Sequence, residues 1–152
     1  MKINRIIAVI LIVFAGAALV YTFTKNSGTT ADQDSLQAAD KNQIYAFYLH
    51  GNKRCATCNT IEQYSHEAID SNFTKEIASG KIIWQTLNFE EPEYDHYITD
   101  FQLYAHSLVL AELAGDSIVR YKNLERVWEL VGDQEIFYQY VQDETAKFLE
   151  GV

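Results

Sequence analysis

A cysteine pair between an apolar run and a helical pattern constrains the fold of this chain more than any other feature. The apolar run, residues 44–49 (IYAFYL), is continuous and holds β-branched and aromatic residues, which is typical of a strand buried on both faces. Cys55 and Cys58 follow it, and a helical pattern runs from about Cys58 until Gly80 stops it. Residues 82–87 (IIWQTL) predict a second strand. A strand, a helix and a strand in this order predict a βαβ unit with parallel strands.

The second half of the chain predicts one more helix, a hairpin and two terminal helices. Pro92, the only proline, suits the first turn of a helix over residues 92–103. Two β-rich runs flank Ala-Gly-Asp, as in a hairpin, and they cover residues 107–113 and 117–122. The closing helices are expected at residues 124–130 and 134–149, with a break near Gly132. The expected fold class is therefore α/β, with a four-stranded mixed sheet flanked by helices.

The N-terminus has the pattern of a membrane anchor. Lys2 and Arg5 precede an uncharged run of 19 residues, 6–24. As a helix this run would span about 28 Å, close to the ~30 Å hydrocarbon core. The small residues 15–17 could form a cleavage site, but the apolar run continues past them, unlike a cleaved signal. We expect residues 1–24 to be an uncleaved single-pass signal anchor, with a cleaved signal as the alternative. The basic flank places the remaining chain outside the cytoplasmic (inner) membrane, facing the periplasm or the exterior.

Composition divides the remaining chain into a tether and one domain. Residues 25–42 are small and polar, so they cannot build a core and are expected to form a flexible tether. Residues 43–152 are long enough for one domain with a hydrophobic core. The net charge is -9, and residues 1–25 hold three basic and no acidic side chains, so residues 26–152 carry -12. Such an acidic body repels phosphate backbones, so a nucleic-acid partner is not expected.

The Cys55–Cys58 spacing favours redox chemistry over the other uses of Cys-x-x-Cys. A c-type haem site needs histidine directly after the second cysteine, where this chain has Asn59, and a zinc ribbon needs a second pair, which the chain lacks. At a helix start the free N–H groups, together with Lys53 and Arg54, should favour the thiolate of Cys55. Cys58, one turn further in, would then resolve a mixed disulfide. The alternative is a pair of inert core thiols.

The residues that carry this pattern resemble a known superfamily. The strand IYAFYLH, the CATC helix and the hairpin SLVLAELAGDSIVRYK are similar, in order, to the thioredoxin-like fold over residues 43–150. More narrowly, YLHGNKRCATCNTIE and the SLVL strand resemble the bacterial ArsF family, described as nitrophenyl compound nitroreductase subunits. The resemblance implies a subunit that handles electrons through thiols. The chain has no G-x-G-x-x-G signature for a flavin or nicotinamide.

The chain departs from thioredoxins at two places that tune the site. Thioredoxins usually carry Trp-Cys-Gly-Pro-Cys, whereas here Ala56 and Thr57 separate the cysteines, which leaves the reduction potential open. Where thioredoxins have a cis-proline before the third strand, this chain has His106. Two thiolates and the His106 imidazole would suit copper(I) or zinc, with His50 as a candidate fourth ligand. The alternative is that His106 hydrogen-bonds within its loop.

The remaining candidates are expected to be structural. His66 and His96 lie among polar helical neighbours and should face solvent, and the acidic residues of 90–95 should form a solvated helix start. The aromatic residues expected in the core are Trp84, Trp128, Phe137, Tyr138 and Tyr140.

These patterns lead to one principal functional hypothesis and two alternatives. The principal hypothesis is a membrane-anchored thiol–disulfide oxidoreductase that uses a redox-active disulfide and requires no cofactor. Its partner would be a protein thiol or disulfide, including a membrane electron-transfer protein, because an extracytoplasmic dithiol needs a source of electrons. The alternatives are a copper- or zinc-binding module, and a non-catalytic accessory subunit.

Overall fold

The computed structural model describes residues 43–151. The predicted anchor, residues 1–24, and the predicted tether, residues 25–42, lie outside the described residues. Among the helices of residues 43–151, none is long and apolar enough to cross a membrane.

A four-stranded mixed sheet forms the centre of the fold, as the sequence predicts. Its strands are β1 (Gln43–His50), β2 (Ile82–Asn88), β3 (Ser107–Ala114) and β4 (Ser117–Asn123), in the spatial order β2-β1-β3-β4. β1 pairs with β2 in parallel, and the pairs β1–β3 and β3–β4 are antiparallel. β1 is buried on both faces, which explains its unbroken apolar run. Each predicted strand begins and ends within one residue of its observed counterpart.

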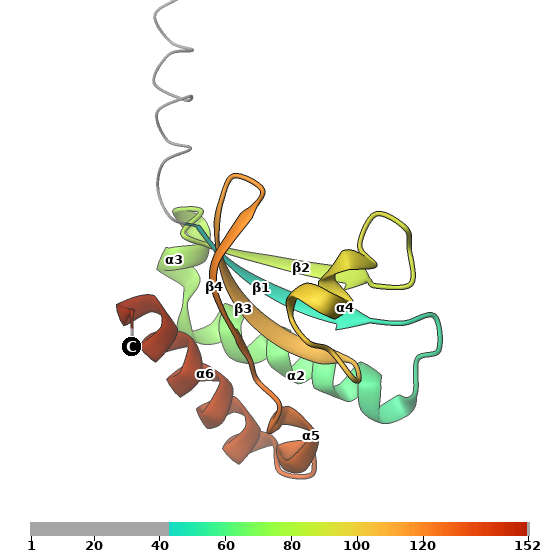
Figure 1. The fold of residues 1–152 in the computed structure, drawn as a ribbon. Coiled ribbons are helices and arrows are strands. Elements are labelled where there is room, and N and C mark those ends of the chain that lie inside the picture. The colour runs from blue at the N-terminus through green and yellow to red at the C-terminus, as the bar shows by residue number, and fades with distance from the viewer. Residues whose placement is uncertain (1–42, 152) are drawn as a thin grey trace, which may run out of the picture. The chain divides into compact units, whose positions relative to one another are not determined.

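Two long helices cover one face of the sheet. They are α2 (Ala56–Asn72) and α6 (Gln134–Glu150), which pack against each other on the same side (Figure 1). Their buried side chains, with those of β1 and β3 that point to this side, form the larger core, which includes Ala46, Tyr48, Ile61, Leu110 and Phe137. α2 ends where Phe73 turns into this core, so the predicted continuation becomes a separate short helix, α3 (Thr74–Ala78).

The opposite face carries a smaller core beneath one short helix, α4 (His96–Asp100). The prediction of a helix over residues 92–103 was wrong in extent, because Pro92 lies in a run of turns before α4. The helix stops early because Gln102 adopts a left-handed conformation with φ of 52°. This reversal lets Phe101 and Leu103 bury their side chains against the sheet.

A third short helix, α5 (Val127–Leu130), precedes α6 and carries Trp128. The expectation that Trp128 belongs to the core was wrong: 38% of this residue is exposed. Trp84 is half-buried and packs on the edge of the larger core, with its ring 4.8 Å from that of His66. Residue type alone could not separate these two tryptophans, because Trp84 lies on β2 and Trp128 on α5, and the packing around each element decides its exposure.

Candidate redox site around the Cys55–Cys58 disulfide

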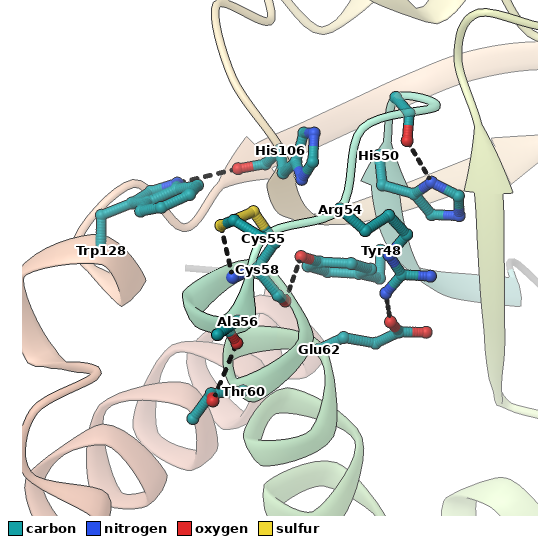
Figure 2. Close-up of a disulfide and its surroundings, with 11 residues drawn as sticks. Tyr48, His50, Arg54, Cys55, Ala56, Cys58, Thr60, Glu62, His106 and Trp128 are labelled. Carbon is teal, nitrogen blue, oxygen red and sulfur yellow. Dashed lines mark hydrogen bonds and ion pairs between the residues drawn. A yellow bond between two sulfur atoms is a disulfide. The ribbon is translucent and has the colours of Figure 1, made fainter.

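Cys55 and Cys58 form a disulfide at the start of α2, with their Cα atoms 5.0 Å apart. Cys55 is the N-cap of the helix: its backbone is extended, with φ of -91° and ψ of 165°. Its Sγ accepts a hydrogen bond from the Cys58 backbone N–H over 3.0 Å (Figure 2). A helix N-terminus presents unpaired N–H groups and a partial positive charge, so this position stabilises a sulfur anion.

The two cysteines differ sharply in their access to solvent. Cys55 is exposed, whereas Cys58 is only 4% exposed and lies in the first turn of α2. Ala56 and Thr57, between them, are also exposed. A partner can therefore approach Cys55, whereas Cys58 is almost fully covered. The alternative of two inert core thiols does not fit this arrangement.

The two basic residues before Cys55 lie in different surroundings. Lys53 is exposed. Arg54 forms an ion pair with Glu62 of α2, and its guanidinium lies 5.8 Å from the centre of the Tyr48 ring. The charge of Arg54 is thus shared with a carboxylate one helical turn below the cysteines. Glu62 is a site residue that the sequence analysis missed, and its place four residues after Cys58 was the available signal.

Tyr48 supports the site from beneath. Its side chain is fully buried in β1, and its hydroxyl donates a hydrogen bond to the Cys58 carbonyl over 2.6 Å. Burial raises the pKa of Tyr48 to about 12, while the charge of Arg54 acts in the opposite direction. Tyr48 therefore stays protonated at neutral pH and fixes the first turn of α2 to the sheet. The strand run holds two tyrosines, Tyr45 and Tyr48, and only strand alternation, which points them to opposite faces, could have hinted at this role for Tyr48.

The strand register brings His50 and His106 together at the same end of the sheet. Leu49 pairs with Ser107, so the histidines directly after and directly before these residues become neighbours, with ring centroids 6.3 Å apart. His50 Nδ1 lies 2.9 Å from the Gly51 carbonyl, which can only accept, so this nitrogen carries the proton. The sequence singled out both histidines, and the sheet places them beside each other.

His106 differs from His50 because its Nδ1 has no hydrogen-bond partner. His106 as a whole is half-buried, but its Nδ1 atom is fully buried. Its backbone carbonyl accepts a hydrogen bond from Trp128 Nε1 over 2.8 Å. Burial lowers the pKa of His106, the charges of His50 and Arg54 lower it further, and Glu90 opposes them. His106 is therefore a neutral imidazole at pH 7.

A network of side chains holds the loop between β1 and Cys55. Asn52 donates to the carboxylate of Glu90 and accepts from the side chain of Asn88. A Cβ on Gly51 would lie 2.4 Å from Glu90 Oε1, so glycine allows this close approach. The acidic run was expected to be a solvated helix start, but Glu90 precedes α4 and holds the loop beside the disulfide.

The other two histidines, His66 and His96, are exposed to solvent, as expected. His66 is exposed against Trp84, and His96 is exposed and contacts Asp100 over 2.7 Å. Across residues 43–151, no group of three or more His, Cys, Asp or Glu side chains is placed to hold a metal ion.

Neither the family models nor the curated proteins match this chain. An exposed sulfur at a helix N-terminus, joined to a buried sulfur one turn further in, can exchange electron pairs with external thiols and disulfides.

Proposed function

We propose that the protein is a thioredoxin-like thiol–disulfide oxidoreductase in which Cys55 attacks and Cys58 resolves. The observation that carries this proposal is the asymmetry of the pair: Cys55 is an exposed helix N-cap, and Cys58 is 4% exposed behind it. The βαβ unit with the cysteines at its strand-to-helix junction supports a thioredoxin-like assignment. The helix N-terminus favours the thiolate at Cys55, and the thiolate is the nucleophile in disulfide exchange.

In the reducing direction the chemistry proceeds in two exchanges. The Cys55 thiolate attacks one sulfur of a substrate disulfide, the substrate S–S bond breaks, and the first substrate sulfur leaves as a thiolate. Cys58 loses its proton and attacks Cys55 Sγ, forming the Cys55–Cys58 disulfide and releasing the second substrate thiolate, which takes up a proton. The substrate gains two electrons and the protein loses two. An external dithiol must then reduce the protein disulfide, and oxidation of a substrate is the same sequence in reverse.

The resemblance to the ArsF family suggests the setting for this chemistry. We propose that the chain is an electron-handling subunit of a reductase system and exchanges electrons with a protein partner through thiols. Its predicted anchor, residues 6–24, would hold the domain at the outer face of the cytoplasmic membrane. A membrane electron-transfer protein is a suitable partner there, since a dithiol outside the cytoplasm needs a continuing supply of electrons.

Trapping of mixed disulfides tests the assignment of the two cysteines. Cys58→Ser in the full chain should accumulate a mixed disulfide with partner proteins, because nothing can resolve the Cys55 adduct. Cys55→Ser should trap nothing, since its remaining thiol is buried. The double variant is the matched control for adducts formed during lysis. Equal trapping by both single variants would refute the assignment, and an absence of trapped adducts would favour a non-catalytic accessory subunit.

The reduction potential of the Cys55–Cys58 couple, measured with and without copper(I) or zinc, separates redox chemistry from metal binding. A thiol–disulfide oxidoreductase should titrate as a two-electron couple near the potential of its partner dithiol. A metal-binding module should instead hold the reduced pair, so that added metal moves the apparent potential.

A further inference from the structure

Cys58 is buried, yet it must lose its proton in the proposed reaction, and the inference below rests on that proposed function. In the second exchange Cys58 must become a thiolate before it can attack Cys55 Sγ. It is only 4% exposed, so bulk water has little access to its thiol. Burial in apolar surroundings also disfavours a thiolate. A neighbouring group that accepts the proton would remove this obstacle.

Two polar groups beneath the disulfide are engaged in other interactions. The hydroxyl of Tyr48 donates to the Cys58 carbonyl, and its pKa of about 12 keeps it protonated. The carboxylate of Glu62 is held in its ion pair with Arg54, on the side of α2 that faces Tyr48. Neither group offers a free basic atom toward the sulfurs.

His106 offers such an atom. Figure 2 shows its ring among the side chains around the disulfide, on the side away from the body of α2. Its Nδ1 is buried and has no hydrogen-bond partner, which normally costs free energy and calls for an explanation. Trp128 holds its backbone carbonyl, and the ring of Phe89 lies edge-on with its centroid 6.0 Å away. The imidazole thus keeps one buried ring nitrogen without a partner, and in the tautomer protonated at Nε2 this nitrogen can accept a proton.

We propose that His106 is the proton acceptor for Cys58 in the resolving step. The Cys58 S–H bond breaks, its proton passes to the imidazole, and the sulfur keeps the electron pair and attacks Cys55 Sγ. The Cys55–substrate bond breaks, and the departing substrate thiolate takes the proton from the imidazolium. In the reverse direction the imidazolium protonates Cys58 as the protein disulfide opens.

The charges around His106 suit a transient proton. Burial lowers the pKa of His106, so the ring is neutral and able to accept at pH 7. His50 and Arg54 disfavour the imidazolium, whereas Glu90 favours it. Cys55 and Tyr48 are the other titratable groups nearby; Cys55 carries no charge while in a mixed disulfide, and Tyr48 stays neutral. The imidazolium is therefore held weakly and returns its proton readily.

Two-step reaction of the reduced full chain with dithiobis(nitrobenzoate) tests this role. Attack by Cys55 releases one thionitrobenzoate, and resolution by Cys58 releases a second, so stopped-flow absorbance follows the two steps separately. The second leaving group needs no protonation, so its release reports the deprotonation of Cys58. Loss of a general base typically costs 10²–10⁴-fold. With hydroxide as a partial substitute, His106→Gln should slow the second step at least ~10-fold at pH 7 and leave the first within about 2-fold.

The pH profile separates a proton acceptor from a merely structural residue. In the natural chain the second rate should rise with pH and level off once His106 is neutral. In His106→Gln it should keep rising with pH, and in His106→Ala added imidazole should restore part of the rate. His66→Gln is the matched control and should change neither step.

Three results would overturn the inference in distinguishable ways. If His106→Gln keeps the natural rate and pH profile of the second step, His106 is not the acceptor, although the proposed function stands. If it slows both steps equally with an unchanged profile, its role is structural. If the natural chain releases no second thionitrobenzoate, the proposed function fails and this inference fails with it.

Discussion

Replacing Arg120 with methionine tests how β3 is held to the C-terminal helix. Glu112 of β3 points to the helical face of the sheet, where only 8% of its side chain is exposed. Arg120, its partner in the β3–β4 register, donates Nε to that carboxylate over 2.5 Å. Its Nη2 donates to the carbonyl of Phe148 over 2.7 Å, and its guanidinium stacks 4.1 Å from the Phe148 ring. One cation therefore joins β3, β4 and α6.

The expected loss follows from what each substitution leaves unpaired. Arg120→Met leaves a buried carboxylate without a cation, which should cost about 3–5 kcal/mol of unfolding free energy. The Arg120 side chain is 33% exposed, so water can reach part of the vacated space and the lower end is expected. The Phe148 carbonyl keeps a hydrogen bond from Gly151, so its own cost is small. Adding Glu112→Leu removes the stranded charge, and the double variant should lie within about 1–2 kcal/mol of the natural chain.

Urea unfolding of the oxidised protein, followed by far-UV circular dichroism, measures these differences. Lys122→Met is the matched control, because Lys122 lies on the same strand but pairs with the mostly buried Glu144, which keeps Lys147 as a second cation. It should cost less than Arg120→Met. A loss below about 1 kcal/mol in Arg120→Met, or a double variant less stable than that single variant, would refute this account of the pair.

Two further predictions concern the site and its location. Reduction of the disulfide should raise the fluorescence of Trp128, since a nearby disulfide quenches an indole. Trp128→Phe should lose this rise, and Trp84→Phe, which removes the indole packed against His66, should keep it. A rise that persists in Trp128→Phe and disappears in Trp84→Phe would show that Trp84 is the quenched indole. The full chain should stay in membranes through a carbonate wash and be cut by protease only after the outer barrier is opened. Release of a chain shortened to begin near Ala18 would instead indicate a cleaved signal.

The sheet and the cysteine pair could be predicted because both depend on local patterns. An unbroken apolar run predicts a strand buried on both faces, and β1 is such a strand. The turn at Gly115, with φ of 61°, joins β3 and β4 as the Ala-Gly-Asp segment predicted. The position of Cys55 before a helix already implied its N-cap role, because capping involves only the next three residues.

The extent of α4 and the exposure of Trp128 could not be predicted from such patterns. A proline and a helical composition favoured a helix over residues 92–103, but burial of Phe101 and Leu103 against the sheet ends it early. Trp128 looked like a core residue by type, yet its indole N–H finds a partner in the His106 carbonyl at the surface. In both cases contacts distant in sequence outweigh local preference.

The sequence alone therefore determined the α/β class, the strand order along the chain and a cysteine pair at a helix start, because hydrophobic period and capping are local. Only the tertiary structure decided what surrounds that pair. It brought Tyr48 beneath Cys58, paired Arg54 with Glu62, and set an unpartnered nitrogen of His106 among the residues around the disulfide. Those contacts depend on strand register and on the packing of α2 and α5, and short-range periodicity carries no information about either.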